Sequence, residues 1–519
     1  MKHLLPFLGL AASSVAFAEV RLPAVISDHM VLQADAPAPL WGWAEPGEEV
    51  KVSLAGSTQK TSADAAGKWS LKLDKLKASS ESQALTVEGV NRITIQDVLV
   101  GEVWLASGQS NMEMQVKGKQ HGAVDHADEE IAAAHFPQIR MFLRDDSFDI
   151  YLPKSTPDEP KQDGKGKWVI CSPETIANFS AVGYFFAREL HRELTRPVGV
   201  IVAAVGGTPI EAWTSREAQE KVPALQPLLK DWQKRLAGHD VAQEYETFMQ
   251  AKKAWLKERA AAQKAGQPLP KTPKPYKNDQ VLKPYGLFNA MIHPLIPYGV
   301  HGVIWYQGER NAAGPFTSLY GMQLATMIKD WRARWGSDFY FAWVQLPRFK
   351  TEQKLPIESN GWGVSVRDEM RRTLSVPNTA MAITIDMGDP KAGHPTNKAD
   401  YAHRLALLAL HDVYHKSGAE YTGPLLKSAE VKGHSVVLTF DHAAGLKAAS
   451  GDLRGFAIAG EDQKFVWAKA VIEGDKVIVS HENIASPASV RYGWASNPIG
   501  NLVNAAGFPA SPFRTDDWK

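Results

Sequence analysis

Cysteine is almost absent from this chain. Cys171 is the only cysteine among 519 residues, so no internal disulfide can form. An apolar core must therefore hold the fold together, and 44% hydrophobic with 22% charged residues is the usual balance of a globular protein. A chain of this length is expected to fold as two to four domains.

An excess of charge of either sign is also lacking. Lysine and arginine number 58, aspartate and glutamate 57, and the net charge is +1. This balance gives no electrostatic reason to expect nucleic acid or an anionic membrane as a partner. The sequence has no group of histidine, cysteine and carboxylate residues at ligand spacing, so neither a metal nor another cofactor is expected. It carries no signal for an oligomeric state.

A long apolar run occurs only at the start of the chain. A basic beginning precedes an apolar run that ends at Phe17, and Ala16-Phe17-Ala18 is an A-x-A cleavage site. The run is too short to span a bilayer, which indicates a signal peptide over residues 1–18 rather than a membrane anchor. We therefore expect an exported protein, periplasmic or secreted, whose mature chain starts near Glu19.

The two ends of the mature chain have the pattern of β structure. Apolar and polar residues alternate at Val50–Leu54 and Trp69–Leu73, which predicts a small antiparallel sandwich over residues 19–98. The same alternation returns at Val436–Phe440. Residues 420–519 are therefore predicted to form a second β module, or to supply strands that complete the first.

The middle of the chain, residues 99–415, repeats strand and then helix. Apolar strands that alternate with amphipathic helices indicate the α/β class, with a parallel sheet covered on both faces. In such sheets the active site lies beyond the carboxyl ends of the strands. The strand-like runs are Val98–Ala106, Val198–Val205, Val300–Tyr306, Phe339–Leu346 and Ala380–Ile385, and the helical stretches are Ala181–Leu194, Tyr320–Trp335 and Tyr401–His411.

Residues 215–275 interrupt this alternation. The segment is rich in Lys, Ala, Gln and Glu and ends in Gly-Gln-Pro-Leu-Pro at 266–270. This composition predicts a solvated helical insertion followed by a Pro-rich loop. A surface role is favoured over the alternative, a lid above the cleft.

Polar groups that could carry chemistry follow several of these strands. Ser110 comes after a turn that Gly108 permits, where its hydroxyl would be a nucleophile at the rim of the sheet; the alternative is a helix cap. Gly206 and Gly207 follow another strand, and two glycines there let a backbone N–H approach a ligand closely; the alternative is a plain strand-to-helix turn. With the N–H of Ser110 and the side-chain amide of Gln307, that N–H could form an oxyanion hole.

A candidate base follows the last strand. His394 lies in a Gly/Pro-rich loop, and Asp389 or Asp386 nearby could orient its imidazole and stabilise the imidazolium. Glu309 could be a base too, but a role in anchoring its own loop is favoured. Because the carboxyl ends of parallel strands share one edge, these groups together fit a nucleophile, oxyanion donors and a base.

Four blocks carry these residues: Gly-Gln-Ser-Asn-Met at 108–112, Gly-Gly-Thr-Pro-Ile-Glu-Ala-Trp at 206–213, Trp-Tyr-Gln-Gly-Glu at 305–309 and His-Pro-Thr-Asn-Lys at 394–398. With these blocks the chain resembles the sialate O-acetylesterases, which are SGNH hydrolases related to acetylxylan and xyloglucan acetylesterases. The resemblance runs from about Asp28 into the C-terminal β region. It implies a three-layer α/β/α flavodoxin-like domain with flanking β modules.

The same resemblance implies roles for individual residues. Ser110 matches the nucleophile of the family and His394 its base, while Gly207 and Gln307 match the oxyanion donors. Two departures from the family pattern stand out. Many SGNH hydrolases have the acid three residues before the histidine, where this chain has Lys391, so Asp389 is the expected acid, with Asp386 or a backbone carbonyl as alternatives. Arg310 follows Gln-Gly-Glu, where this branch usually has serine.

The resemblance implies a serine esterase that removes O-acetyl groups from a carbohydrate through an acetyl-serine intermediate. The sugar would be sialic acid or a plant polysaccharide such as xyloglucan or xylan. The composition, with sixteen tryptophans and a net charge near zero, slightly favours a neutral polysaccharide as the substrate. The alternatives are a non-catalytic carbohydrate-binding protein, disfavoured by the intact catalytic residues, and a lipid or short-chain esterase, disfavoured because long apolar stretches near the cleft are not evident.

Overall fold

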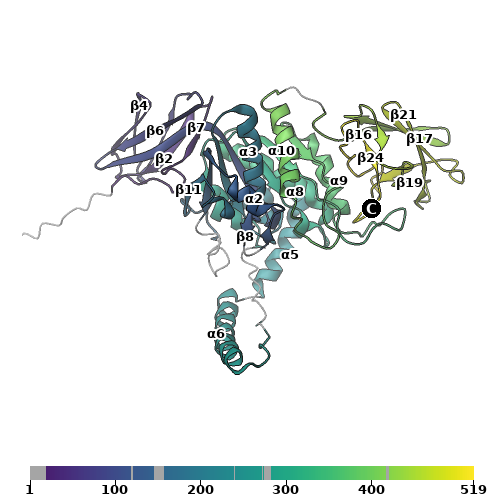
Figure 1. Cartoon of the computed structure of the whole chain (residues 1–519), viewed down its shortest axis with the longest axis horizontal. Helices are drawn as coiled ribbons and strands as arrows, with labels where there is room; N and C mark the ends of the chain where they lie inside the picture. The colour runs from purple at the N-terminus through teal and green to yellow at the C-terminus, as the bar shows by residue number, and fades with distance from the viewer. Residues whose placement is uncertain are drawn as a thin grey trace, which may run out of the picture.

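The computed structural model describes residues 19–118, 121–144, 157–238, 240–271, 273, 282–416 and 420–518. The segment expected to be a signal peptide, residues 1–18, lies outside the described residues. Three parts follow one another along the long axis of the molecule: an N-terminal β module, a central α/β part and a C-terminal β module (Figure 1).

The N-terminal module is built mainly from antiparallel strands in two sheets, and its first strand, β1, pairs in parallel with β7. One sheet pairs β4 with β3, β3 with β6 and β6 with β7, and the other pairs β2 with β5. The predicted alternation is present, since Val50, Val52 and Leu54 are all at most 1% exposed. The strands are β1 (Val31–Gln33), β2 (Ala38–Trp43), β3 (Glu49–Leu54), β4 (Ser57–Ser62), β5 (Lys68–Leu73), β6 (Ser79–Glu88) and β7 (Arg92–Gly108).

Strand β7 joins this module to the central part. Its first half pairs with β6, and its second half pairs in parallel with β12 and β13. The expected boundary at residue 98 therefore falls inside one continuous strand. The alternating pattern of its first half gives way to an unbroken buried run from Val98 onward, as its neighbours change from one module to the next.

The central sheet has the order β11-β10-β12-β7-β13-β14-β15. All neighbours are parallel except β11, which is antiparallel to β10. This arrangement confirms the predicted α/β class. The strands other than β7 are β10 (Phe136–Arg144), β11 (Gly166–Cys171), β12 (Val198–Ala204), β13 (Gly302–Tyr306), β14 (Tyr340–Val344) and β15 (Thr379–Ala382).

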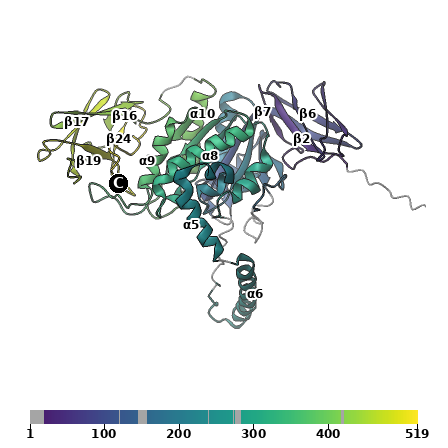
Figure 2. The same ribbon diagram turned by 180° about the vertical axis from the view of Figure 1, so that it is seen from behind.

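Helices cover both faces of this sheet (Figures 1 and 2). α3 (Ala181–Leu194) and α10 (Lys398–Asp412) pack on the face that carries Trp104 and Ala106. α8 (Tyr320–Trp335) and α9 (Val364–Arg372) pack on the opposite face, which carries Leu105. Alternate residues of β7 thus feed two separate cores, as the period of a strand requires.

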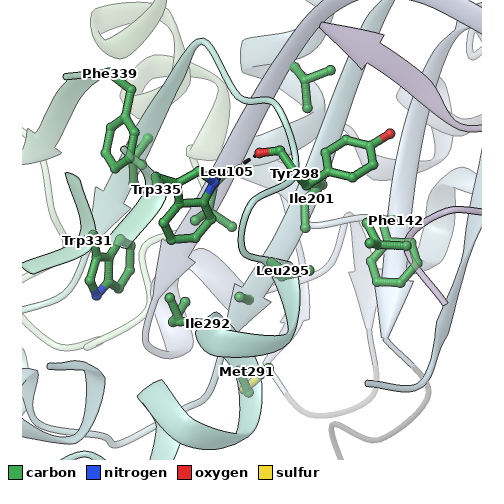
Figure 3. Close-up of a cluster of buried hydrophobic side chains, with 14 of the residues drawn as sticks. Leu105, Phe142, Ile201, Met291, Ile292, Leu295, Tyr298, Trp331, Trp335 and Phe339 are labelled. Atoms are coloured by element: carbon green, nitrogen blue, oxygen red, sulfur yellow. Dashed lines mark hydrogen bonds between the residues drawn. The ribbon is translucent and has the colours of Figure 1, made fainter. Parts of the chain in front are cut away.

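The core beneath α8 is rich in aromatic rings. Trp331 and Trp335 of α8 face Leu105 and Ile201 of the sheet across this core (Figure 3). The indole N–H of Trp335 donates a hydrogen bond of 2.9 Å to the carbonyl oxygen of Tyr298, so the buried polar atom is satisfied.

The insertion forms three helices, α4 (Arg216–Glu220), α5 (Gln226–Ala237) and α6 (Val241–Ala265). α5 buries Leu228 and Trp232 against the central part. α6 extends away from the rest of the molecule (Figure 1), and its described side chains are exposed or partly exposed. Much of the Pro-rich loop that follows lies outside the described residues.

The C-terminal module has sheets of its own and, within the described residues, adds no strand to the N-terminal module. Its sheets are β16-β17-β22-β21, β20-β19-β23-β25 and β18-β24, around a core that includes Val436, Leu438 and Phe440. The strands are β16 (Leu425–Lys432), β17 (Ser435–Asp441), β18 (Lys447–Ala448), β19 (Phe456–Ala459), β20 (Val466–Trp467), β21 (Lys469–Glu473), β22 (Lys476–Ser480), β23 (Ser489–Tyr492), β24 (Leu502–Val503) and β25 (Phe513–Arg514).

Candidate active site

Ser110 stands directly beyond the carboxyl end of β7. The strand ends at Gly108, and a short helix, α1 (Ser110–Glu113), begins with the serine. Gly108 has a φ of 139°, and a Cβ there would lie 2.2 Å from the carbonyl oxygen of Tyr306. Only glycine fits this position, so the sharp turn that presents the hydroxyl depends on it.

His394 comes from near the C-terminal end of the central α/β part and lies beside Ser110 in space. It lies in the loop between β15 and α10, and its Nε2 is 2.8 Å from the hydroxyl oxygen of Ser110. This is the geometry in which a neutral imidazole accepts the hydroxyl proton. The structure thus brings together two residues that are 284 positions apart in the sequence.

The loop after β12 lies against the same serine. A Cβ on Gly206 would be 3.4 Å from the Cβ of Ser110, and the N–H of Gly206 donates to Oε2 of Glu113 at 2.8 Å. Gly207 has a φ of 72° and open space where a side chain would be. Among the described residues, no acceptor pairs with the N–H of Gly207 or of Ser110. Both groups are free to bind an oxyanion.

The pKa of the His394 imidazole is lowered to about 4. Desolvation is the main cause, because the ring is half-buried; the neighbouring His121 and the ammonium of Lys398 add to it. The rings of His394 and His121 have centroids 4.5 Å apart. A neutral imidazole is the form that acts as a base, so the surroundings favour the reactive state over a wide pH range.

The comparisons with known proteins agree with this geometry. A family described as carbohydrate esterase, sialic acid-specific acetylesterase, matches residues 100–259. The chain is 36% identical to a carbohydrate acetylesterase from Xanthomonas citri, of which it covers 100% with 96% of its own length, at a TM-score of 0.76. Sialate O-acetylesterases from Rattus norvegicus and Homo sapiens are 27% and 26% identical over 92% of this chain, covering 90% and 88% of theirs.

This chain belongs to the carbohydrate acetylesterase family. It therefore hydrolyses O-acetyl esters on carbohydrates. Among the described residues of this acetylesterase, no helix is long and apolar enough to cross a membrane, and no group of three or more metal-ligating side chains could hold a metal ion.

The side-chain amide of Gln307, the expected third oxyanion donor, is paired with protein atoms in the structure. The side chain is fully buried, and its amide nitrogen donates to three protein acceptors: the carbonyl oxygen of Thr208 at 3.0 Å, Oδ1 of Asn311 at 2.8 Å and Oε1 of Gln109 at 3.2 Å. An amide with two hydrogens has none left for a substrate. In this acetylesterase Gln307 ties the loops after β7, β12 and β13 together.

The expected acid is likewise not on the imidazole. Asp389 is exposed and accepts a hydrogen bond from the backbone N–H of Lys391 within its own turn. Asp386 forms a two-point ion pair with Arg404. No carboxylate hydrogen-bonds to His394 in the part of the chain that the structure describes. The polar turn that holds Asp389 satisfies its carboxylate locally, which sequence spacing cannot indicate.

Several residues of the site were not singled out from the sequence. Asn111, Lys398 and His121 all lie within the immediate surroundings of Ser110 and His394. Asn111 and Lys398 belong to the sequence blocks at 108–112 and 394–398, which is the signal that could have found them. His121 stands in no such block, and only the fold brings it to the site.

Proposed function

We propose that this acetylesterase works through an acetyl-Ser110 intermediate. His394 takes the proton of the Ser110 hydroxyl as the oxygen attacks the acetyl carbonyl, and the N–H groups of Ser110 and Gly207 stabilise the tetrahedral oxyanion. His394 then returns the proton to the departing sugar hydroxyl. Water, activated by the same imidazole, releases acetate. The 2.8 Å contact between Ser110 and His394 is the observation that carries the proposal.

The base works as half of a dyad. Since the described residues place no carboxylate on His394, the imidazolium that forms during each step has no paired anion to stabilise it. A low pKa makes this cation a strong acid, which favours rapid donation of the proton to the sugar oxygen.

Substitution of the nucleophile tests this mechanism. Ser110→Ala should lower the kcat for p-nitrophenyl acetate by about 10⁴-fold or more, because nucleophile and base act as a unit. An organophosphonate should label wild-type Ser110 covalently, and mass spectrometry of peptides should locate the label. Ser172→Ala, which removes a serine directly after β11 whose hydroxyl hydrogen-bonds within its own turn, is the control and should keep full activity. Wild-type turnover by Ser110→Ala would remove the residue from the scheme.

For the substrate, we propose an O-acetylated sialic acid. The named activity of the mammalian relatives supports this assignment. The abundance of tryptophan is no evidence for a neutral polysaccharide, because the fully buried side chains include Trp104, Trp213, Trp305, Trp331 and Trp343.

Acetate release from acetylated sialic acid, xylan and xyloglucan should be compared; faster release from xylan or xyloglucan would overturn the assignment. Preference for p-nitrophenyl octanoate over acetate would favour a lipid esterase.

We also propose that the protein is exported to the periplasm through cleavage after Ala18. The apolar run and the A-x-A site in the first 18 residues support this. N-terminal sequencing of the protein from a periplasmic fraction should find Glu19 first. Recovery of the full-length chain from the cytoplasm alone would contradict the proposal.

A further inference from the structure

A buried polar cluster lies directly behind the proposed catalytic pair. It comprises Asn111, Glu309, Lys398 and the carbonyl of Gly393, and is called the Asn111 cluster below. The Nζ of Lys398 donates to Oδ1 of Asn111 at 2.7 Å. The amide nitrogen of Asn111 donates to Oε1 of Glu309 and, at 3.1 Å, to the carbonyl oxygen of Gly393. One amide therefore bridges an ammonium, a carboxylate and a backbone carbonyl.

Two of the three cluster side chains are fully buried, and Glu309 is partly exposed but buries its Oε2 atom. Lys398 is 0% exposed and Asn111 is 1% exposed. The ammonium of Lys398 stands 5.6 and 5.3 Å from the ring centroids of Tyr306 and Tyr401, which add cation–π attraction. Burial of such groups is costly even when they are paired, and an apolar filling would often be as stable. Stability alone therefore does not explain why these groups are buried here.

The position of the amide in the chain indicates that role. Asn111 follows Ser110, and Gly393 precedes His394. The hydrogen bond between Asn111 and Gly393 therefore connects the residue beside the nucleophile with the residue beside the base. The oxygen and nitrogen of the Asn111 side chain cannot exchange places. In the flipped orientation the NH₂ group would face the ammonium of Lys398 and the oxygen would face Glu309.

We propose that Asn111, held in one orientation by Lys398 and Glu309, is a positioning residue that keeps His394 within hydrogen-bond reach of Ser110. This inference rests on the catalytic roles proposed above for Ser110 and His394. None of the three cluster side chains needs to touch the substrate. A displacement of the base by about 1 Å costs an enzyme on the order of 10²-fold in rate, so a fixed link between the two loops has a large effect.

The ammonium of Lys398 has a second consequence for the same pair. Its positive charge disfavours protonation of His394 and so helps to keep the base neutral. Among the described residues, the other ionisable groups that face the cluster and the base are Glu309 on the loop after β13, Asp125 and His121 on the segment before α2 (Ala127–Ala132), and the phenols of Tyr306 and Tyr401. Removal of the ammonium should therefore raise the pKa of the base.

The first test replaces the bridging amide. Asn111→Ala should lower the kcat for p-nitrophenyl acetate by about 10- to 100-fold with the KM changed less than about two-fold, because the substrate loses no contact. Asn111→Asp should act similarly, since an acceptor then faces the carbonyl of Gly393. A thermal melt of each variant reports whether the fold is kept. A kcat within two-fold of wild type in folded Asn111→Ala overturns the inference.

The second test replaces both ionisable side chains together, so that neither is left buried without the other. The double variant Lys398→Met with Glu309→Gln should lower kcat and move the acid limb of kcat/KM upward by about 0.5 to 1 pH unit. Lys391→Met removes an exposed ammonium from the same loop and should leave both quantities unchanged. A lower kcat without any move of the acid limb, or an unchanged kcat, contradicts the role given to the pair.

Organophosphonate labelling separates the two levels of the argument. If the label reaches Ser110 in wild type but Asn111→Ala keeps its kcat, only the positioning inference fails. If Ser110 is not labelled and Ser110→Ala remains active, the proposed mechanism itself fails.

Discussion

At the scale of single residues, the low pKa of His394 determines how the activity of this acetylesterase depends on pH. His394 must be neutral to take the proton of Ser110. Burial, the adjacent His121 ring and the ammonium of Lys398 lower its pKa from 6.5 to about 4. The base is thus already deprotonated in solutions in which a free histidine would be mostly charged.

We therefore expect kcat/KM to stay nearly constant from pH 7 down to about pH 5 and to fall only as the pH approaches 4. The pH dependence of kcat/KM for p-nitrophenyl acetate measures this limb. His121→Phe removes a ring that can carry positive charge next to the base, so the limb should move to higher pH. A limb centred near 6.5 in the wild-type enzyme would contradict the assignment.

Gln307 gives a second prediction at this scale. Its buried amide joins three loops. Gln307→Ala leaves the carbonyl oxygen of Thr208 without its side-chain donor and removes one of the donors to Gln109 and Asn311, so it should cost about 1–3 kcal/mol of folding free energy. The kcat of the folded variant should fall less than ten-fold, whereas loss of an oxyanion donor costs about 10²–10³. Thermal melts and steady-state kinetics together distinguish a structural role of Gln307 from a role as oxyanion donor. A variant with wild-type stability and a kcat lowered 10³-fold would support the oxyanion role.

The residues that the sequence predicts well are those whose role depends on local chain geometry. Ser110 and Gly207 each follow a strand at a turn that requires glycine, and His394 follows the last strand, so their common edge could be inferred from the pattern alone. The orientation of a side chain depends on tertiary contacts instead. For that reason the pattern predicted neither the buried amide of Gln307 nor the local turn that occupies Asp389.

At the scale of elements, apolar runs located most of the central strands. All five predicted runs overlap strands of the sheet, and Ala181–Leu194 is a helix over that same range. β10 and β11 were missed. β10 carries Pro137, Arg140 and Arg144 and so lacks a continuous apolar run; its Arg140 is nonetheless buried because Asp97 pairs with it at 2.7 Å. The local sequence does not show that a buried charge is paired with a residue from a distant part of the chain, so the strand could not be recognised from its composition.

The exposed helix α6 allows a prediction about the insertion. A proline inside a helix costs about 3 kcal/mol or more in that helix. Ala254→Pro should break α6 but leave the main melting transition and the kcat unchanged, because α6 contributes little to the central cores. Ala325→Pro is the matched control in α8, which packs on the sheet, and it should unfold the catalytic part. A marked loss of kcat in folded Ala254→Pro would favour the lid.

At the scale of the whole molecule, the two β modules are joined to the sheet by different means. The N-terminal module shares a strand, β7, with the catalytic part. The C-terminal module shares none, and a buried arginine of α9 reaches across instead. Arg367 donates to the carbonyl oxygens of Leu346 and Pro347 on the catalytic side and of Ala495 and Ser496 on the module side.

Arg367 is 0% exposed, and burial lowers its pKa to about 9, because all four of its acceptors are neutral carbonyls. Arg367→Met fills similar space but leaves these carbonyls without donors, so it should cost about 2–5 kcal/mol and lower the melting temperature by several degrees. Arg348→Met removes an exposed arginine close by and should change neither stability nor kcat. Calorimetry should show whether the weakened link also splits the transition, with the C-terminal module melting first, because that module keeps its own core but loses a buried polar connection. A melting temperature equal to that of wild type would mean that other contacts between the module and α9, such as the ion pair of Arg514 with Asp368, hold the two parts together.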